Sequence, residues 1–160
     1  MNIKSNLSLD TADIEILREL QQNARISNLE LSDKVNLSAT PCARRVKALE
    51  ASGVIDSYVT RLNPEALGLS LTIHLAVTMD LHTPERFSAF ESAITGFDEI
   101  ISCSVVTGRS EDYLLKVVAR DMQHYQQFLL GKLTGLPGVR GVHSSFELRS
   151  VIDRTALPLD

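Results

Sequence analysis

Two helices joined by a very short turn are predicted from residues 27–53, SNLELSDKVNLSATPCARRVKALEASG. The first begins at Ser27, which can form a capping box with Glu30, so that each side chain satisfies a free backbone amide. The second begins at Ser38 and ends at Gly53, a residue type favoured just beyond the last helical turn. This stretch therefore indicates two consecutive short helices, the second running to the glycine.

The turn between these two helices is the most informative local feature. Only Asn36 and Leu37 separate the first helix from the Ser38 cap. So short a connection makes the helices cross steeply, which is helix-turn-helix geometry. A plain three-helix bundle is the alternative that the spacing leaves open.

The flanking residues extend this first domain in both directions. An earlier helix begins at Asp10, and its apolar residues recur at helical spacing: Ile14, Leu17, Leu20 and Ala24. After Gly53, the β-branched and aromatic stretch Val54–Leu62 predicts a strand, which would form a wing behind the second helix of the pair. The turn-prone residues 63–68 then mark the end of the domain.

The rest of the chain has a different period. Residues 71–80 alternate between apolar and polar side chains, which is typical of a half-buried strand. Strands and helices then follow in the order β-α-β-β-α-β, the ferredoxin-like arrangement, with the expected elements at residues 71–80 (strand), 83–94 (helix), 101–107 and 113–119 (hairpin), 121–136 (helix) and 139–151 (strand). The expected domains are residues 1–62, a linker at 63–70, and residues 71–160.

The sheet of this second domain suggests self-association. Several strands carry apolar residues in both phases, as at Leu114–Leu115 and Val117–Val118. Since a sheet with one solvent-facing side usually alternates cleanly, we expect its open face to be buried against a second copy. The expected product is a two-fold symmetric dimer.

Composition and charge limit the classes of function. The 160 residues contain 16 Lys and Arg against 20 Asp and Glu, with 44% hydrophobic side chains, which fits one or two small globular domains. The purely apolar runs are far shorter than a membrane span, and the first residues lack the apolar core of a secretory signal. We therefore expect a cytoplasmic protein. Its two cysteines, Cys42 and Cys103, are too isolated to predict a disulfide framework or a cysteine zinc site.

The distribution of charge is more informative than the total. Residues 1–62 hold eight basic and eight acidic side chains, so the whole net charge of −4 lies in residues 63–160. Within the first domain, Ser38–Leu49 carries three positive charges and no negative one. With Ala43, Val46 and Leu49 facing inward, the exposed face of this helix can contact bases and phosphates through Thr40, Arg44 and Lys47, with Arg45 beside them. A solvated helix face without a nucleic-acid partner is the alternative.

Enzymatic functions have little support. The four histidines lack the spacing of metal ligands, and no phosphate-binding glycine loop or nucleophile motif occurs. We predict no catalytic residue, no metal site and no cofactor.

A small-molecule site is suggested by the residues at one strand end. Gly108 allows a close backbone approach, and acidic Glu111 and Asp112 follow it. An α-amino acid could place its ammonium near these carboxylates and its carboxylate near loop amides or Arg109. An ordinary charged hairpin turn is the alternative.

Several motifs together resemble the Lrp/AsnC family of transcriptional regulators, also called feast/famine proteins. The resemblance covers nearly the whole chain and is most specific around the predicted helix-turn-helix. The segments that carry it are residues 9–25, 31–55, 63–68, 106–108, 112–115 and 136–139.

The resemblance implies a winged helix-turn-helix domain followed by a ferredoxin-like effector and oligomerisation domain, an α+β chain. It implies double-stranded DNA as a partner, dimers that assemble further to octamers, and an amino-acid effector bound between subunits. DNA contacts carried over by position fall on Ser38, Thr40, Pro41, Arg44, Arg45 and Lys47.

The effector loop carried over from the family falls on Thr107, Gly108 and Asp112, with Arg109 added from the chemistry above. The family usually places two residues between the glycine and the aspartate, whereas three intervene in this chain. We expect the extra residue to reshape the pocket. Two other functions stay open: an architectural DNA-binding protein without an effector, and a small-molecule-binding ferredoxin-like protein.

Overall fold

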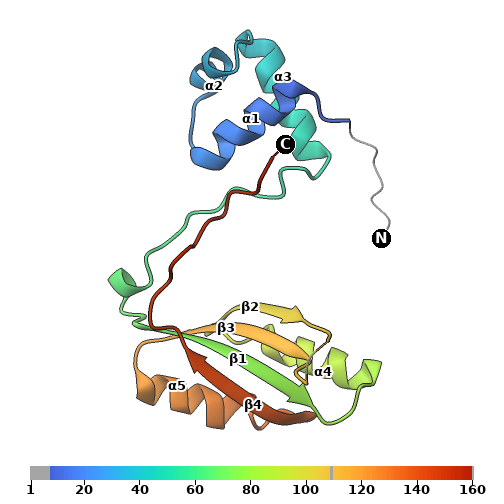
Figure 1. Cartoon of the computed structure of the whole chain (residues 1–160), viewed down its shortest axis with the longest axis vertical. Helices are drawn as coiled ribbons and strands as arrows, with labels where there is room; N and C mark the ends of the chain where they lie inside the picture. Colours follow the sequence, from blue (N-terminus) through green and yellow to red (C-terminus); the bar gives the residue numbers. More distant parts are fainter. Residues whose placement is uncertain (1–7, 109, 160) are drawn as a thin grey trace. The chain divides into compact units, whose positions relative to one another are not determined.

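The structure is a computed structural model that describes residues 8–108 and 110–159. It divides the chain into two compact units. The first unit comprises the residues up to Arg61 together with those from Ile152 onward, and the second comprises Leu62–Val151 (Figure 1). The expected second domain ran to residue 160, so the structure differs from that expectation at the C-terminal end.

The first unit contains three helices, α1 (Thr11–Gln22), α2 (Asn28–Lys34) and α3 (Ala39–Ala51). Capping boxes form at the start of α1, between Asp10 and Asp13, and at the start of α2, between Ser27 and Glu30. The helices enclose a small core of six buried side chains: Ile16, Leu17, Leu31, Val35, Cys42 and Leu49. The helical content of this domain is thus as the sequence predicted.

The turn between α2 and α3 has a specific backbone cause. Asn36 adopts a left-handed conformation, with φ of 53°, which a short polar side chain tolerates better than most. The Leu37 amide then donates to the Ser32 carbonyl at 2.9 Å, closing the end of α2. This reversal sets the short helix-turn-helix connection.

The predicted wing strand over Val54–Leu62 is wrong for the isolated chain. Residues 56–63 have no regular secondary structure. The composition favours an extended backbone, but a strand also needs a neighbour to accept and donate its ladder hydrogen bonds. Among the described residues, no such neighbour pairs with this segment.

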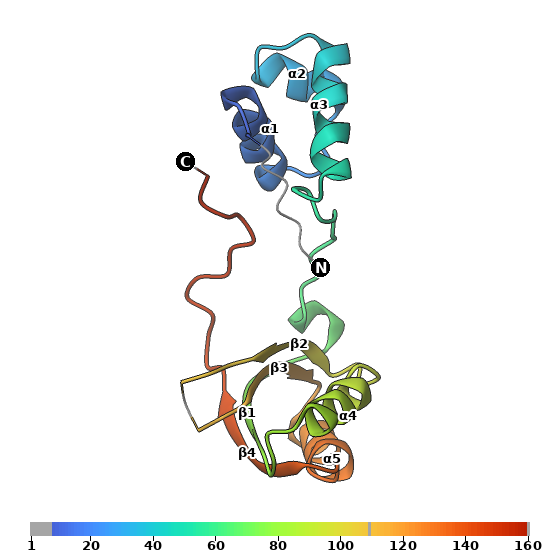
Figure 2. The same cartoon turned by 90° about the vertical axis from the view of Figure 1, so that its right-hand side faces the viewer.

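The second unit is a four-stranded antiparallel sheet with helices on one face (Figure 2). Its order along the chain is β-α-β-β-α-β, and the strands lie in the order β2-β3-β1-β4. Its elements are β1 (Leu71–Met79), α4 (Pro84–Ile94), β2 (Ile100–Val105), β3 (Tyr113–Ala119), α5 (Met122–Phe128), the π-helical turn η2 (Leu129–Leu133) and β4 (Val139–Phe146). The ferredoxin-like prediction is confirmed, although the last strand ends at Phe146 rather than Val151.

The core of this unit lies between the sheet and the helices. Alternate residues of β1 and β3 face it, including Leu75, Val77 and Leu115, and Phe90 and Phe128 pack against them from the helices. Both ends of the sheet order, β2 and β4, are edge strands.

The open face of the sheet is less apolar than the sequence suggested. Residues that pair across neighbouring strands point to the same face of the sheet. The register therefore places mainly small and polar residues on the open face: Thr72, His74, Ala76, Thr78, Ser102, Ser104, Leu114, Lys116, Val118, Gly141, His143 and Ser145. The most exposed apolar side chains of the sheet lie on the edge strand β2, where Ile101 is 60% and Val105 61% exposed, against 42% for Leu114 on the open face. The expectation of an apolar open face is therefore wrong.

Candidate DNA and effector sites

The exposed face of α3 is the candidate DNA-binding surface. Thr40, Arg44 and Lys47 are exposed, while Cys42 and Leu49 are buried in the helical core. Three exposed side chains at positions i, i+4 and i+7 lie on one face of a helix. The sequence-based assignment of the outward residues thus agrees with their exposure.

These side chains line a shallow hollow of about 470 Å³ together with Asn28, Ala39 and Ala43. Asn28 was not among the predicted site residues. Its Nδ2 donates to the Ala39 carbonyl at 2.9 Å, which joins the start of α2 to the start of α3. The only sequence signal was its place directly after the Ser27 cap, which does not by itself suggest a contact with the next helix.

The N-terminal end of α3 carries the remaining predicted contacts. Ser38 is the N-cap, but its side chain makes no capping hydrogen bond, and it is exposed. Pro41 lies half-buried in the first turn, where its missing amide costs no helical hydrogen bond. The first amides of a helix and a free hydroxyl are suitable partners for a phosphate oxygen.

Arg45 lies on the same helix but is engaged elsewhere. Its Nη1 lies 2.8 Å from Asp10 Oδ2 and 2.8 Å from Asp13 Oδ1, both at the start of α1. The Asp13 and Asp10 hydrogen bonds raise the pKa of Arg45. The Asp13 backbone amide is the main cause of a lowered pKa at Asp10, Arg45 lowers it further, and burial opposes the shift. Arg45 therefore fastens α3 to α1.

The predicted effector loop lies between β2 and β3. Thr107 and Gly108 are exposed, and Gly108 has φ of 90°, a conformation that favours glycine. Arg109 lies outside the described residues. The loop closes on the sheet because the Val106 amide donates to the Asp112 carbonyl at 2.9 Å.

Asp112 is bonded within its own unit. Its Oδ2 accepts a hydrogen bond from the Met79 amide at 2.7 Å, and its Oδ1 lies 2.8 Å from His82 Nε2. The Asp112 amide also donates to the Val77 carbonyl at 2.9 Å. Asp112 therefore ties the loop to the end of β1, a role that the sequence did not indicate.

Neither a metal site nor a membrane span emerges from the described residues. Across residues 8–108 and 110–159, no group of three or more His, Cys, Asp or Glu side chains is placed to hold a metal ion. No helix in the same part of the chain is long and apolar enough to cross a membrane.

The first unit is a helix-turn-helix, a motif whose second helix lies in the major groove of DNA in DNA-binding proteins, and the second unit is ferredoxin-like. Residues 9–56 match a family model described as "winged helix-turn-helix DNA-binding", and residues 72–157 match the "Lrp/AsnC ligand binding domain". The chain belongs to the Lrp/AsnC family, and it is a DNA-binding transcriptional regulator of that type.

Similar proteins span almost the same length. The chain is 40% identical to the Bkd operon transcriptional regulator of Pseudomonas aeruginosa over 151 residues. The matched residues cover 94% of this chain and 98% of the relative. It is 44% identical to the leucine-responsive regulatory protein of Haemophilus influenzae, over 94% and 90% of the two chains. A Neisseria meningitidis transcriptional regulator, solved as its L-Met complex, is 37% identical to this chain, with a TM-score of 0.91. The match covers 96% of this chain and 98% of that chain.

Proposed function

We propose that the regulator reads DNA through α3, with Thr40, Arg44 and Lys47 in the major groove. Ser38 and Pro41 lie at the phosphate-facing end of the helix. The observation that carries this proposal is the set of three exposed side chains lining one hollow with Asn28. Arginine and lysine donors there can reach guanine edges or phosphates. Arg45 contributes by holding α3 against α1, because two carboxylates already engage its guanidinium.

We further propose that an amino acid binds at the Thr107–Asp112 loop, between the second units of two copies. The Neisseria relative was solved with L-Met, and several relatives are named leucine-responsive. The exposure of Thr107 and Gly108 supports a site completed by another chain, since one copy alone does not enclose it. Loop amides would bind the carboxylate, with Arg109 and Asp112 as the charged partners.

Self-association is part of the same proposal. Ile101 and Val105 leave an apolar stripe on the edge strand β2, and Val59 is 75% exposed in the unpaired segment after α3. Edges and apolar stripes of this kind are usually covered by another chain. We propose a homodimer that assembles further, up to an octamer, in the cytoplasm, and that acts by binding rather than by catalysis.

An architectural role without an effector is the second candidate. It is favoured by Asp112, whose two carboxylate oxygens already have partners within the chain. A ligand ammonium would have to share or displace them. The two candidates agree on DNA binding and differ in whether any amino acid changes it.

One binding experiment tests these functions. We expect DNA upstream of the gene to bind with an affinity that falls as salt rises, because phosphate contacts release counterions. Arg44→Ala should weaken binding about tenfold or more. The matched control is Arg140→Ala, which removes an exposed arginine from the second unit.

The same titration is repeated with a panel of free amino acids that includes L-leucine and L-methionine. A shift in DNA affinity with one of them supports the effector proposal, and binding without any shift supports the architectural role. Wild-type affinity in Arg44→Ala would overturn the assignment of the recognition face.

A further inference from the structure

The C-terminal segment Ile152–Leu159 groups with the DNA-binding unit, although it follows the effector domain in sequence. Arg18 Nη2 on α1 donates to the Leu159 carbonyl at 2.7 Å. Gln21, one turn further along α1, donates from Nε2 to the Leu157 carbonyl at 3.2 Å and accepts from the Leu157 amide at 2.5 Å. The α1 surface thus binds the backbone of an extended segment.

An apolar contact adds to these hydrogen bonds. Leu159 is partly buried and packs against the core of the three helices, whereas Leu157 is 71% exposed. The three helices therefore contact the backbone at Leu157 and Leu159 and, in addition, the side chain of Leu159.

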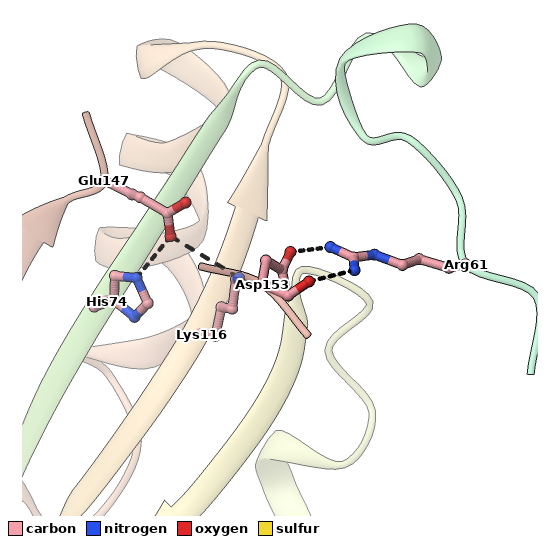
Figure 3. A network of polar contacts seen from close by, with 5 residues as sticks. All are labelled: Arg61, His74, Lys116, Glu147 and Asp153. Atoms are coloured by element: carbon pink, nitrogen blue, oxygen red, sulfur yellow. Dashed lines mark hydrogen bonds and ion pairs between the residues drawn. The ribbon is translucent and has the colours of Figure 1, made fainter. Parts of the chain in front are cut away.

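A second contact joins the two places where the chain crosses between units. Arg61 precedes the first crossing, and Asp153 follows the second. Arg61 Nη1 donates to the Asp153 carbonyl at 2.9 Å, and Nη2 forms an ion pair with its carboxylate (Figure 3). Because they lie at the crossings, these two residues hold the exit and the re-entry of the chain together.

Glu147, five residues before this segment, is anchored in the sheet. The Glu147 amide donates to the Thr72 carbonyl at 2.9 Å, directly after β4. The Glu147 carboxylate lies 2.9 Å from His74 Nε2 and 3.9 Å from Lys116 Nζ (Figure 3). Between the anchors, Leu148 and Val151 are highly exposed. The tail, residues 147–159, is thus hydrogen-bonded at both ends, with exposed side chains between them.

We propose that Ile152–Leu159 is a strap that fastens the DNA-binding unit to the end of β4, as a second tie beside the linker. A unit held by two ties explores less space than one held by a single flexible linker. In a dimer, this raises the effective concentration of the second recognition helix at the second DNA half-site. The DNA consequence rests on the proposed function, whereas the strap itself does not.

The direct test is the distribution of distances between spin labels on the two units. Labels are placed at Asp33→Cys in α2 and Gln127→Cys in α5, both exposed, in a Cys103→Ser background. The labelled chain is diluted with unlabelled chain so that only distances within one chain are measured. Leu159→Ser should give a clearly broader distribution than wild type.

Two further variants separate release of the strap from damage to the fold. Leu148→Ser makes the same change in the tail at a side chain that is 98% exposed, and it should leave the wild-type distribution unchanged. Gln21→Ala leaves the tail and the helical core intact but removes both bonds to Leu157, and it should broaden the distribution. Equal widths in wild type, Leu159→Ser and Gln21→Ala would overturn the strap.

Whether the strap belongs to its own chain is settled by crosslinking Gln22→Cys, an exposed neighbour of Gln21, to Leu157→Cys with a short bismaleimide in the same background. Crosslinked peptides recovered from the band of single-chain mass support the strap. A band of two-chain mass would show that the α1 surface holds the tail of a second copy, which overturns a strap within one chain.

The consequence for DNA is measured on duplexes with one or two half-sites, selected from a random-sequence pool. Releasing the strap should weaken binding to paired half-sites about tenfold and leave binding to one half-site within about twofold. Equal loss on both duplexes would contradict the effective-concentration argument. If no sequence is selected, the proposed function fails while the distance measurement still decides the strap.

Discussion

At the scale of single residues, two neighbouring arginines on α3 have different surroundings. Arg44 is exposed and lines the hollow, whereas Arg45 lies against Asp10 and Asp13. Helical spacing predicted which side chains face outward. It could not predict that a carboxylate pair more than thirty positions earlier would engage one of them, because that pairing depends on how α1 crosses α3.

The charge of Asp10 should contribute stability that depends on pH. Its pKa is lowered in the folded chain, mainly by the Asp13 backbone amide. A lowered pKa means that the contribution is full above the unfolded-state pKa and is lost as the pH falls through the folded-state pKa. Asp10→Asn keeps a good N-cap and removes the charge. We expect it to melt below wild type at pH 7.

The difference in melting temperature should begin to shrink as the pH falls below the unfolded-state pKa of about 4, and it should disappear below the lower folded-state pKa, where the wild-type carboxyl is neutral as well. Thermal denaturation followed by circular dichroism measures this difference in melting temperature. Scans between about pH 3 and pH 7 cover the usual pKa of an aspartate side chain. A difference that stays constant over this range would show that the change acts through packing or capping rather than through charge.

At the scale of elements, the helices and most strands could be predicted because their patterns and caps are local. The wing strand and the end of β4 could not. Val54–Leu62 and the residues after Phe146 have extended-chain composition, but a strand exists only where another strand offers its hydrogen bonds. That partner is a property of the assembled fold, so composition alone overestimates strand length.

The turn that leads into β4 depends on one glycine. Gly138 has φ of 96°, and a Cβ there would lie 3.0 Å from Met79 Cε and 3.2 Å from Arg86 Cδ. Its carbonyl accepts from the Asp80 amide at 2.8 Å, so the backbone is held close to the end of β1. Gly138→Ala should cost about 1–3 kcal/mol of unfolding free energy through backbone strain and crowding.

Gly141→Ala is the matched control for this prediction. A Cβ at Gly141 would meet no atom within 4 Å, and its backbone has no positive φ. Its effect should stay within about 1 kcal/mol. Urea denaturation of both variants measures the difference, and equal losses would mean that the turn tolerates a side chain.

At the scale of the whole molecule, the division into units could be predicted only in part. The linker at residues 63–70, inferred from its turn-forming residues, stays a prediction. The return of Ile152–Leu159 to the first unit could not be predicted. Nothing in the sequence around Arg18 and Gln21 indicates that these side chains bind the backbone of a distant segment. Likewise, alternation suggested an apolar open face, whereas the register places the exposed apolar residues at the β2 edge.

Assembly should therefore depend on that edge. We expect wild type to sediment as a multiple of the 17.6 kDa chain, and Ile101→Lys to shift the distribution toward single chains. Leu130→Lys is the control, since Leu130 is 61% exposed, against 60% for Ile101, but lies on the π-helical turn. Analytical ultracentrifugation at several concentrations measures the shift, and a wild type that sediments as single chains would refute the assembly.

The seat of the C-terminal segment has a consequence for building hybrid regulators. A chimera cut once, in the linker, would join the three helices of one protein to the tail of another. That tail would then meet an α1 surface with which its sequence has not been matched. A hybrid that exchanges DNA-binding units intact needs two junctions, one at each crossing of the chain, so that residues 152–159 travel with the helices they contact.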